Sequence, residues 1–379
     1  MPNTTNHNTS KQVSMKNKII TISFLLCICG LFIVNLAKPS QELSYSERRR
    51  LAQFPKFSVK TLMNADYMRG IDKYAVDQFV GREWFRSVKV AVDRNAFRKL
   101  DTNGLFRIGE DIFSIEYPLN EDKVIYLTSR LNAVYEKYLK GMNIYYTIIP
   151  DKNYHLSDNG QYLIMDYDRL TQLVQENMMK DAKYINLYDA LSLDNYYNTD
   201  GHWRQETLKP IVDTLYEAMG IEIRFIPGSY EQKSYEPFYG AYYGQSAATK
   251  GADVIKWLEN DVTRDAKVVS LGHNNQEDLP IYYEEGLGGM DSYDVFLYGA
   301  QPLITLVNTH YPQGKELLLF RDSYGSSIAP IMLEAYSKIT LIDLRYITQE
   351  LLGEFVEFNG QDVLFMYSST IANNSDIIR

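Results

Sequence analysis

The feature that most constrains this chain is an uncharged run near its N-terminus, the 19 residues from Ile19 to Ala37. At about 1.5 Å per residue, a helix of this length is just long enough to cross a bilayer. Three lysines precede the run, and basic flanking residues favour the cytoplasmic side. The run therefore predicts a single-pass anchor, with residues 1–18 in the cytoplasm and everything after Lys38 outside.

A cleavable signal sequence is the alternative interpretation of the same run. Asn35-Leu36-Ala37 is a poor match to the small-residue pattern of a cleavage site, so we favour an uncleaved anchor. Both cysteines of the chain, Cys27 and Cys29, lie inside the run. The exported part is therefore expected to have no disulfide and no cysteine ligand for a metal.

The exported part is acidic. The chain has 39 basic and 48 acidic residues, a net charge of −9, and residues 1–38 hold four of the lysines and no acid. A protein that binds nucleic acid needs a basic face, so the charge balance argues against that class. With 45% hydrophobic and 23% charged residues, the composition is that of a globular protein and excludes a largely disordered or collagen-like chain.

Short apolar runs alternate with helical stretches over much of the chain. Five runs are rich in β-branched and aromatic residues: Asn143–Pro150, Lys183–Leu187, Glu316–Phe320, Ile339–Leu344 and Asp362–Tyr367. Helical apolar spacing marks the stretches Tyr167–Asp181, Ser326–Ser337 and Tyr346–Glu357. Continuous apolar strands joined by helices are typical of a parallel sheet covered on both faces. The pattern predicts a three-layer α/β/α sandwich with about five parallel strands.

The length of 379 residues allows two domains or one enlarged α/β domain. We expect a cytoplasmic tail (1–18), an anchor or signal sequence (19–37), a linker (38–58) and one domain (59–379). Residues from about 224 to 311 interrupt the strand–helix rhythm with turns, glycines and paired tyrosines, which indicates an insertion in that domain. Between Val59 and Leu100 the apolar spacing predicts one or two amphipathic helices.

The segment LLLFRDSYGSSIAP, residues 317–330, contains a candidate nucleophile. A strand is expected to end at Phe320, and a helix to begin near Ser326 or Ser327 with Pro330 in its first turn. Ser323 then lies at the carboxyl edge of the sheet, where ligands bind and free N–H groups can hold an oxyanion. The structural alternative is that Ser323 only caps the helix or fills the turn.

The segment NYYNTDGHWRQET, residues 195–207, supplies a candidate base and acid. A serine hydroxyl becomes a nucleophile when a base takes its proton, and the base needs an acid to orient it. Asp200 and His202 are separated by one residue and can converge from a single tight turn. A partly buried histidine bonded to a neighbouring carbonyl is the structural alternative for His202.

Several segments together resemble a known family. The segments ERRRLAQFP, IIPDKN, TDGHW, FYGAYYGQSAATKGADVI, FRDSYGSS and LIDLRYI occur in this order. They resemble the bacterial DHHW proteins, relatives of the alginate O-acetyltransferases in the SGNH-hydrolase superfamily. The resemblance extends from about residue 45 to the end, and TDGHW and RDSYGSS are its most specific parts.

The resemblance implies a flavodoxin-like SGNH fold and a Ser-His-Asp triad. By position in the motifs, Asp200 matches the acid, His202 the base, Trp203 the tryptophan and Ser323 the nucleophile. Gly201 stands where the family name has histidine, which leaves the triad intact but puts in doubt any substrate contact of that histidine. Because Asp-x-His precedes the serine, the order favours the acetyltransferase-like branch over secreted lipases.

Four further residues in family-like segments are candidates for oxyanion or substrate contacts: Gly240, Asn308, Tyr324 and Arg345. A glycine in a turn and an arginine after a strand also have structural explanations, and the same holds for Lys152. The remaining histidines, among them His155, His273 and His310, show no metal-ligand spacing. The 31 tyrosines can line a sugar groove by stacking, although a compositional bias explains their number equally well.

The sequence thus predicts a membrane-anchored, extracytoplasmic O-acetyltransferase that acts on a cell-surface or secreted polysaccharide and requires no metal or bound cofactor. The resemblance implies a multi-pass membrane O-acyltransferase as the acetyl supplier. One alternative is an acetyl esterase that uses the same triad with water as acceptor. The other is a non-catalytic subunit for carbohydrate binding or assembly.

Overall fold

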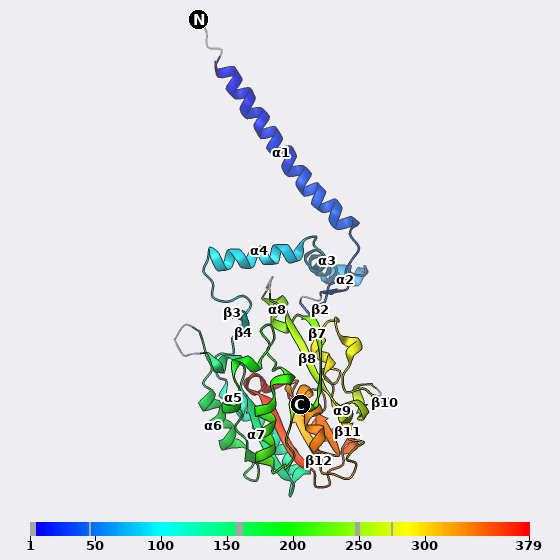
Figure 1. The fold of residues 1–379 in the computed structure, drawn as a ribbon. Helices are drawn as coiled ribbons and strands as arrows, with labels where there is room; N and C mark the ends of the chain where they lie inside the picture. Colours follow the sequence, from blue (N-terminus) through cyan, green and yellow to red (C-terminus); the bar gives the residue numbers. More distant parts are fainter. Residues whose placement is uncertain (1–4, 45–46, 157–161, 247–250, 274–275) are drawn as a thin grey trace. The chain divides into compact units, whose positions relative to one another are not determined.

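The computed structural model describes residues 5–44, 47–156, 162–246, 251–273 and 276–379 (Figure 1). The chain divides into two compact units, Met1–Phe97 and Arg98–Arg379. The helices that follow Val59, which the sequence analysis joined to the main domain, lie in the first unit.

The first unit begins with α1 (Thr5–Ala37), whose segment Met15–Ala37 is long and apolar enough to cross a membrane. The short antiparallel strands β1 (Leu43–Ser44) and β2 (Arg49–Arg50) follow. Three helices then come in place of the expected one or two: α2 (Val59–Met63), α3 (Asp66–Asp77) and α4 (Arg82–Asn95). The break before α4 falls at Gly81, whose φ of 73° suits a residue without a Cβ.

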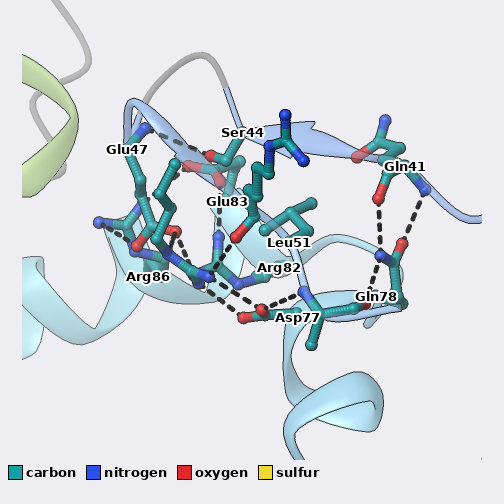
Figure 2. A network of polar contacts seen from close by, with 12 residues as sticks. Gln41, Ser44, Glu47, Leu51, Asp77, Gln78, Arg82, Glu83 and Arg86 are labelled. Atoms are coloured by element: carbon teal, nitrogen blue, oxygen red, sulfur yellow. Dashed lines mark hydrogen bonds and ion pairs between the residues drawn. The ribbon is translucent and has the colours of Figure 1, made fainter. Parts of the chain in front are cut away.

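Charged and amide side chains hold the linker and the helices of the first unit together (Figure 2). The Glu47 carboxylate contacts the guanidinium groups of Arg49 at 3.0 Å, Arg82 at 2.6 Å and Arg86 at 3.3 Å. Asp77 accepts hydrogen bonds from Arg49 and from the N–H of Ala52, and the Arg49 bond is the main reason that its pKa falls to about 2. The ERRRLA segment is therefore held mainly by ion pairs.

The second unit is built on an eight-stranded sheet with the order β10-β9-β11-β13-β12-β14-β5-β6. Five adjacent strands are parallel: β13 (Lys338–Ile342), β12 (Glu316–Arg321), β14 (Asp362–Ser368), β5 (Asn143–Ile149) and β6 (Lys183–Tyr184). These are the five apolar runs from which the sheet was predicted, so that prediction is confirmed.

Helices cover both faces of this sheet. One face packs against α5 (Glu121–Val134), α6 (Tyr167–Asn177), α11 (Leu352–Phe355) and α12 (Ser369–Asn373), and the other against α7 (Lys209–Met219) and α10 (Tyr324–Met332). The alternation along β12 shows why its run is apolar throughout, since Leu318 and Phe320 face the first layer and Leu319 the second. The three-layer α/β/α fold is confirmed.

The region expected as an insertion contributes to the sheet. Strands β9 (Lys267–Ser270), β10 (Gln276–Leu279) and β11 (Leu303–Val307) extend it with antiparallel pairing beyond β13. The same region carries a separate hairpin of β7 (Glu231–Phe238) and β8 (Asp253–Glu259), together with α8 (Ala241–Gln245) and α9 (Asp261–Asp265). A further hairpin, β3 (Leu105–Ile108) and β4 (Asp111–Ser114), precedes α5.

The turn that carries Ser323 is tighter than expected. Strand β12 ends at Arg321 and α10 begins at Tyr324, so Ser323 occupies the N-cap position. Pro330 consequently lies inside α10 and not in its first turn, which corrects the sequence expectation.

Candidate active site

Ser323 lies at the carboxyl end of β12, where Asp322 shapes the turn. The buried Asp322 carboxylate accepts hydrogen bonds from the N–H of Tyr324 at 3.0 Å and of Ser368 at 2.8 Å. It thus joins the start of α10 to the end of the neighbouring strand β14. The Asp-Ser pair of the RDSYG motif combines a turn-forming acid with the serine that the turn presents.

Asp200 and His202 lie in a tight loop whose two sides pair with each other. A bridge joins Tyr196 to Trp203, and the N–H of Tyr197 donates to the carbonyl of His202 at 3.1 Å. Within the loop, Asp200 Oδ1 accepts both the backbone N–H of His202 at 3.0 Å and its ring Nδ1 at 2.6 Å. The loop therefore brings acid and base together, as the Asp-x-His spacing suggested.

The structure brings Ser323 to the same histidine. His202 Nε2 lies 2.6 Å from Ser323 Oγ, within the hydrogen-bond reach that the triad interpretation required. Because the Asp200 carboxylate can only accept, Nδ1 carries a hydrogen, and in the neutral ring Nε2 is free to accept the serine proton. Asp200 is 1% exposed, so the acid is withdrawn from water behind the histidine.

Residues of the insertion hold the acid loop in place. Asp253, at the start of β8, accepts hydrogen bonds from the N–H groups of Asn198 at 3.0 Å and Thr199 at 2.7 Å. The N–H of Ala241 donates to Asp200 Oδ2 at 2.6 Å. Sequence analysis missed Asp253 and Ala241, because their only signal was their place in a family-like segment.

The tyrosines Tyr293 and Tyr324 pack against the histidine. The ring of Tyr293 stacks on that of His202, with centroids 4.0 Å apart and planes 13° apart, and Tyr324 lies against it at 5.1 Å. Burial raises the pKa of the Tyr293 hydroxyl above its ordinary value, so it stays protonated and donates to Ser327 Oγ at 3.0 Å. Ser327 also accepts the indole N–H of Trp203 at 2.8 Å, which ties the TDGHW loop to α10.

Lys152, a minor candidate in the sequence, is a buried structural cation. Its ammonium donates to the carbonyls of Ile112 at 3.0 Å and Tyr197 at 2.8 Å, and forms an ion pair with Asp111 at 2.9 Å. Burial lowers its pKa, while the neighbouring Asp111 opposes that shift. Lys152 thus connects the end of β5 to β4 and to the loop that carries Asp200.

Gly201, the departure from the DHHW pattern, leaves room for Tyr242. A Cβ at position 201 would meet the Tyr242 hydroxyl and lie 3.1 Å from Cζ of the same ring. Burial raises the pKa of Tyr242, and the charge of Asp200 adds to that shift. A phenol from α8 therefore lies beside the triad loop, over the position that lacks a side chain.

Of the four residues expected to contact the oxyanion or the substrate, Gly240 and Tyr324 lie against the loop that carries Asp200 and His202. The N–H of Gly240 donates a hydrogen bond to Thr199 Oγ1 at 2.9 Å. The N–H of Tyr324 donates to Asp322, and its hydroxyl donates to the Gly201 carbonyl. Both residues therefore support the site, but these groups are not free for an oxyanion.

Asn308 and Arg345 are not brought to the triad by any described contact. Because β11 runs antiparallel to β13, Asn308 lies at the opposite edge of the sheet from Ser323, where its amide bonds to the carbonyl of Leu333. Arg345 follows β13 on the correct edge, but its guanidinium forms a two-bond pair with Asp343 at 2.9 and 2.7 Å. The proposed site role of Asn308 is corrected on this ground.

Other possible ligand sites lie apart from the triad. Among the residues that the structure describes, no group of three or more His, Cys, Asp or Glu side chains is arranged to hold a metal ion. A pocket of about 650 Å³ in the insertion is lined by Tyr282, Tyr283 and Tyr298, but not by Asp200, His202 or Ser323. Of the tyrosines considered for a sugar groove, Tyr196 and Tyr197 are core residues.

The α/β/α sandwich, with a serine after a parallel strand and an Asp-x-His loop earlier in the chain, defines a protein of the SGNH-hydrolase fold class. A search of family models and a search of curated proteins find no match. Solved structures do share the fold. A DHHW family protein from Eubacterium siraeum is 18% identical, with a TM-score of 0.59 over 74% of this chain and 97% of its own.

PatB1 from Bacillus cereus is 14% identical, with a TM-score of 0.57 over 71% of this chain and 96% of its own. A second structure of PatB1, with a sulfonyl adduct, is also 14% identical and has a TM-score of 0.54 over 71% of this chain and 97% of its own. The resemblance to the DHHW proteins is thereby confirmed at the level of the fold.

Proposed function

We propose that this protein is an extracytoplasmic O-acetyltransferase that acetylates a cell-surface or secreted polysaccharide through an acetyl-serine intermediate. The observation that carries the proposal is the continuous chain of contacts from Asp200 through His202 to Ser323, with 2.6 Å on each side of the imidazole. Such a chain suits acyl transfer, because one base can serve both the attack of the serine and the attack of the acceptor.

In the first half-reaction, Ser323 Oγ attacks the carbonyl carbon of an acetyl donor while His202 Nε2 takes the hydroxyl proton. The tetrahedral intermediate collapses, the donor's leaving group departs with the proton from Nε2, and acetyl stays esterified to Oγ. The N–H of Ser323, for which the described contacts provide no acceptor, is the oxyanion donor that we propose. Asp200 remains ionised and stabilises the imidazolium.

In the second half-reaction, a sugar hydroxyl transfers its proton to His202 Nε2 and attacks the acetyl carbonyl. The ester bond to Ser323 breaks, and Oγ recovers the proton. Holding the sugar hydroxyl in line gives it an effective concentration advantage over bulk water, and this advantage separates a transferase from an esterase. We propose Tyr242 as a contact of the acceptor, and its hydroxyl beside the open position at Gly201 supports this role.

The proposed location follows from α1. A helix long and apolar enough to cross a membrane, with lysines on its N-terminal side, supports a single-pass protein whose second unit is outside the cytoplasm. We propose a multi-pass membrane O-acyltransferase as the acetyl supplier. Fractionation and sizing of the mature protein test the anchor, because a soluble product that begins near Lys38 would contradict it.

The chemistry is tested by mass spectrometry of the purified protein after incubation with an activated acetyl ester. We expect an acetyl adduct on Ser323 that is lost in Ser323→Ala, strongly reduced in His202→Ala and less reduced in Asp200→Ala. The matched control is Ser326→Ala, which removes a buried hydroxyl without a hydrogen-bond partner in the first turn of α10 and should retain the adduct. A sulfonyl fluoride should label the same serine.

The acceptor distinguishes the alternatives. For a transferase, added oligosaccharide should speed the loss of acetyl from Ser323 and yield acetylated sugar. Release of acetyl to water alone would support the esterase, and the absence of any adduct would support the non-catalytic subunit.

A further inference from the structure

The helices of the first unit expose an unusual amount of apolar surface. None of the residues of α2, α3 or α4 is a buried apolar side chain, although α3 and α4 have amphipathic sequences. Large apolar side chains are exposed on these helices and just before them: Phe54, Phe57, Val59, Leu62, Met63, Met68, Val76, Trp84, Phe85, Val88 and Val92. A soluble surface rarely exposes so many without a partner.

On α4 these residues form one stripe. Trp84, Phe85, Val88 and Val92 are spaced so that they fall on one side of a helix with 3.6 residues per turn. The exposed Lys89 borders the stripe, and its long side chain can extend toward a polar phase while its stem covers apolar surface. An aromatic and aliphatic stripe beside a basic residue is typical of a helix that lies in the plane of a bilayer interface.

A hydrogen bond ties these helices to the end of the membrane segment. Asn35, in the last turn of α1, accepts the N–H of Val80 at 2.8 Å and donates to the carbonyl of Leu31 at 2.8 Å. Val80 lies in the bend between α3 and α4. The bend is thus held beside the point where the apolar segment ends, which is the depth of the bilayer surface if α1 spans the membrane.

The charge of this part of the chain is opposite to that of the rest. Residues 38–97 contain 12 basic and 7 acidic residues, whereas residues 98–379 contain 24 basic and 41 acidic. A net positive segment next to a membrane helix is attracted to anionic headgroups, and a strongly negative one is repelled by them. The charge therefore favours lipid contact for the first unit alone.

We propose that α4, with the exposed apolar residues of α2 and α3, docks on the surface of an anionic bilayer as a second membrane contact beside α1. The occupant of the apolar face is the headgroup and upper acyl region of the lipid. The proposal goes beyond the enzymatic function and rests on the proposed α1 anchor only for the depth of the bend in the bilayer.

Trp84 reports on this contact directly. It is 63% exposed, whereas the other two tryptophans, Trp203 and Trp257, are 0% and 3% exposed. The full-length protein is reconstituted in bilayers of phosphatidylglycerol and phosphatidylcholine, and the Trp84→Tyr variant is used to isolate the Trp84 emission. Lipids brominated near the headgroup should quench this emission more strongly than lipids brominated near the chain end, and aqueous acrylamide should quench it weakly.

A pair of variants tests the stripe itself. Val88→Glu places a charge on the stripe, and Ser87→Glu adds the same charge at the adjacent position on another side of α4. We expect Val88→Glu to reduce quenching by headgroup-brominated lipid at least about twofold, and Ser87→Glu to leave it nearly unchanged. Because Val88 is exposed, its substitution should not unfold the unit, which circular dichroism checks.

The other outcomes overturn the proposal. Strong acrylamide quenching without lipid quenching means that the face stands in water. Protection from both acrylamide and brominated lipid means that a protein, either a second copy or another membrane protein, covers the face. Extraction of the protein by alkaline carbonate would contradict the α1 anchor separately, and lipid quenching of Trp84 after re-addition of vesicles would then still support the surface contact.

Discussion

The two units of this protein are stabilised in contrasting ways. Among its described residues, the first unit has one buried apolar side chain, Leu51, surrounded by the ion pairs of Glu47 and Asp77. The second unit has two large apolar clusters, one on each face of its sheet. Burial of apolar area is the dominant favourable contribution to folding, and partly exposed ion pairs contribute little each.

This difference indicates what each unit depends on. The second unit can position a buried acid such as Asp200 because a rigid core surrounds it. The first unit lacks such a core and should depend on its ion pairs and on the surface against which its apolar side chains lie. Damage to one unit should therefore leave the other folded.

The largest effect is expected from the core of the second unit. Phe320→Ala removes a fully buried ring that packs against Phe365 at 4.8 Å, and should lower the free energy of unfolding by about 3–5 kcal/mol. Urea unfolding monitored by hydrogen exchange measures this for each unit. Equal loss of protection in α3 and α4 would mean that the units are not independent.

The stability of the second unit is also expected to change with pH. Burial, and secondarily the charge of Asp151, raises the pKa of Glu116 from 4.5 to about 7. Between these values the folded state holds a proton that the unfolded state has lost, so stability falls as the pH rises from about 4.5 to 7. Glu116→Gln should remove this slope and, at pH 8, gain about 2–3 kcal/mol relative to the parent.

Thermal unfolding from pH 5 to 8 tests the Glu116 prediction. Glu121→Gln is the control, because Glu121 is exposed and its pKa is lowered by its bond to Arg169. If the slope persists in Glu116→Gln, another group causes it.

The smallest effect is expected in the first unit. Glu47→Gln removes a carboxylate, 15% exposed, that contacts three arginines, and should destabilise the unit by about 1–2 kcal/mol, less at high salt. The control is Glu83→Gln, whose 56% exposed carboxylate pairs with Arg82 and Arg86 and should matter by less than about 1 kcal/mol. Limited proteolysis between α1 and α4 provides the measurement, and equal effects of the two variants would contradict the importance of Glu47.

Much of the fold could be predicted from the sequence because strands buried on both faces are apolar throughout. The antiparallel strands β9 and β10 were missed, since each has four residues and lies at or near an edge of the sheet. Strand direction also leaves little trace in the residues of one strand. Asn308 was named as a contact because it lies in a family-like segment, and only the antiparallel pairing of β11 shows that it lies at the far edge of the sheet from Ser323.

The candidate site, like the fold, could be predicted from the sequence only in part. Asp200, His202 and Ser323 could be named because their residue types and motif spacing are informative, and the structure places them in hydrogen-bond contact. The residues that hold this triad in place could not be predicted from the sequence. Asp253 and Tyr293 reach the loop from segments that are distant in sequence, and only the folded chain brings them there.

Lys152 also determines where the chain can be cut. Its ammonium binds β4 on one side and the backbone before Asp200 on the other, so the β3–β4 hairpin is part of the framework of the site. A fragment that starts after Ser114 would leave this buried cation without Asp111 and the Ile112 carbonyl, next to the loop that carries Asp200. The shortest fragment with an intact triad must therefore begin before Leu105, close to the boundary that follows Phe97.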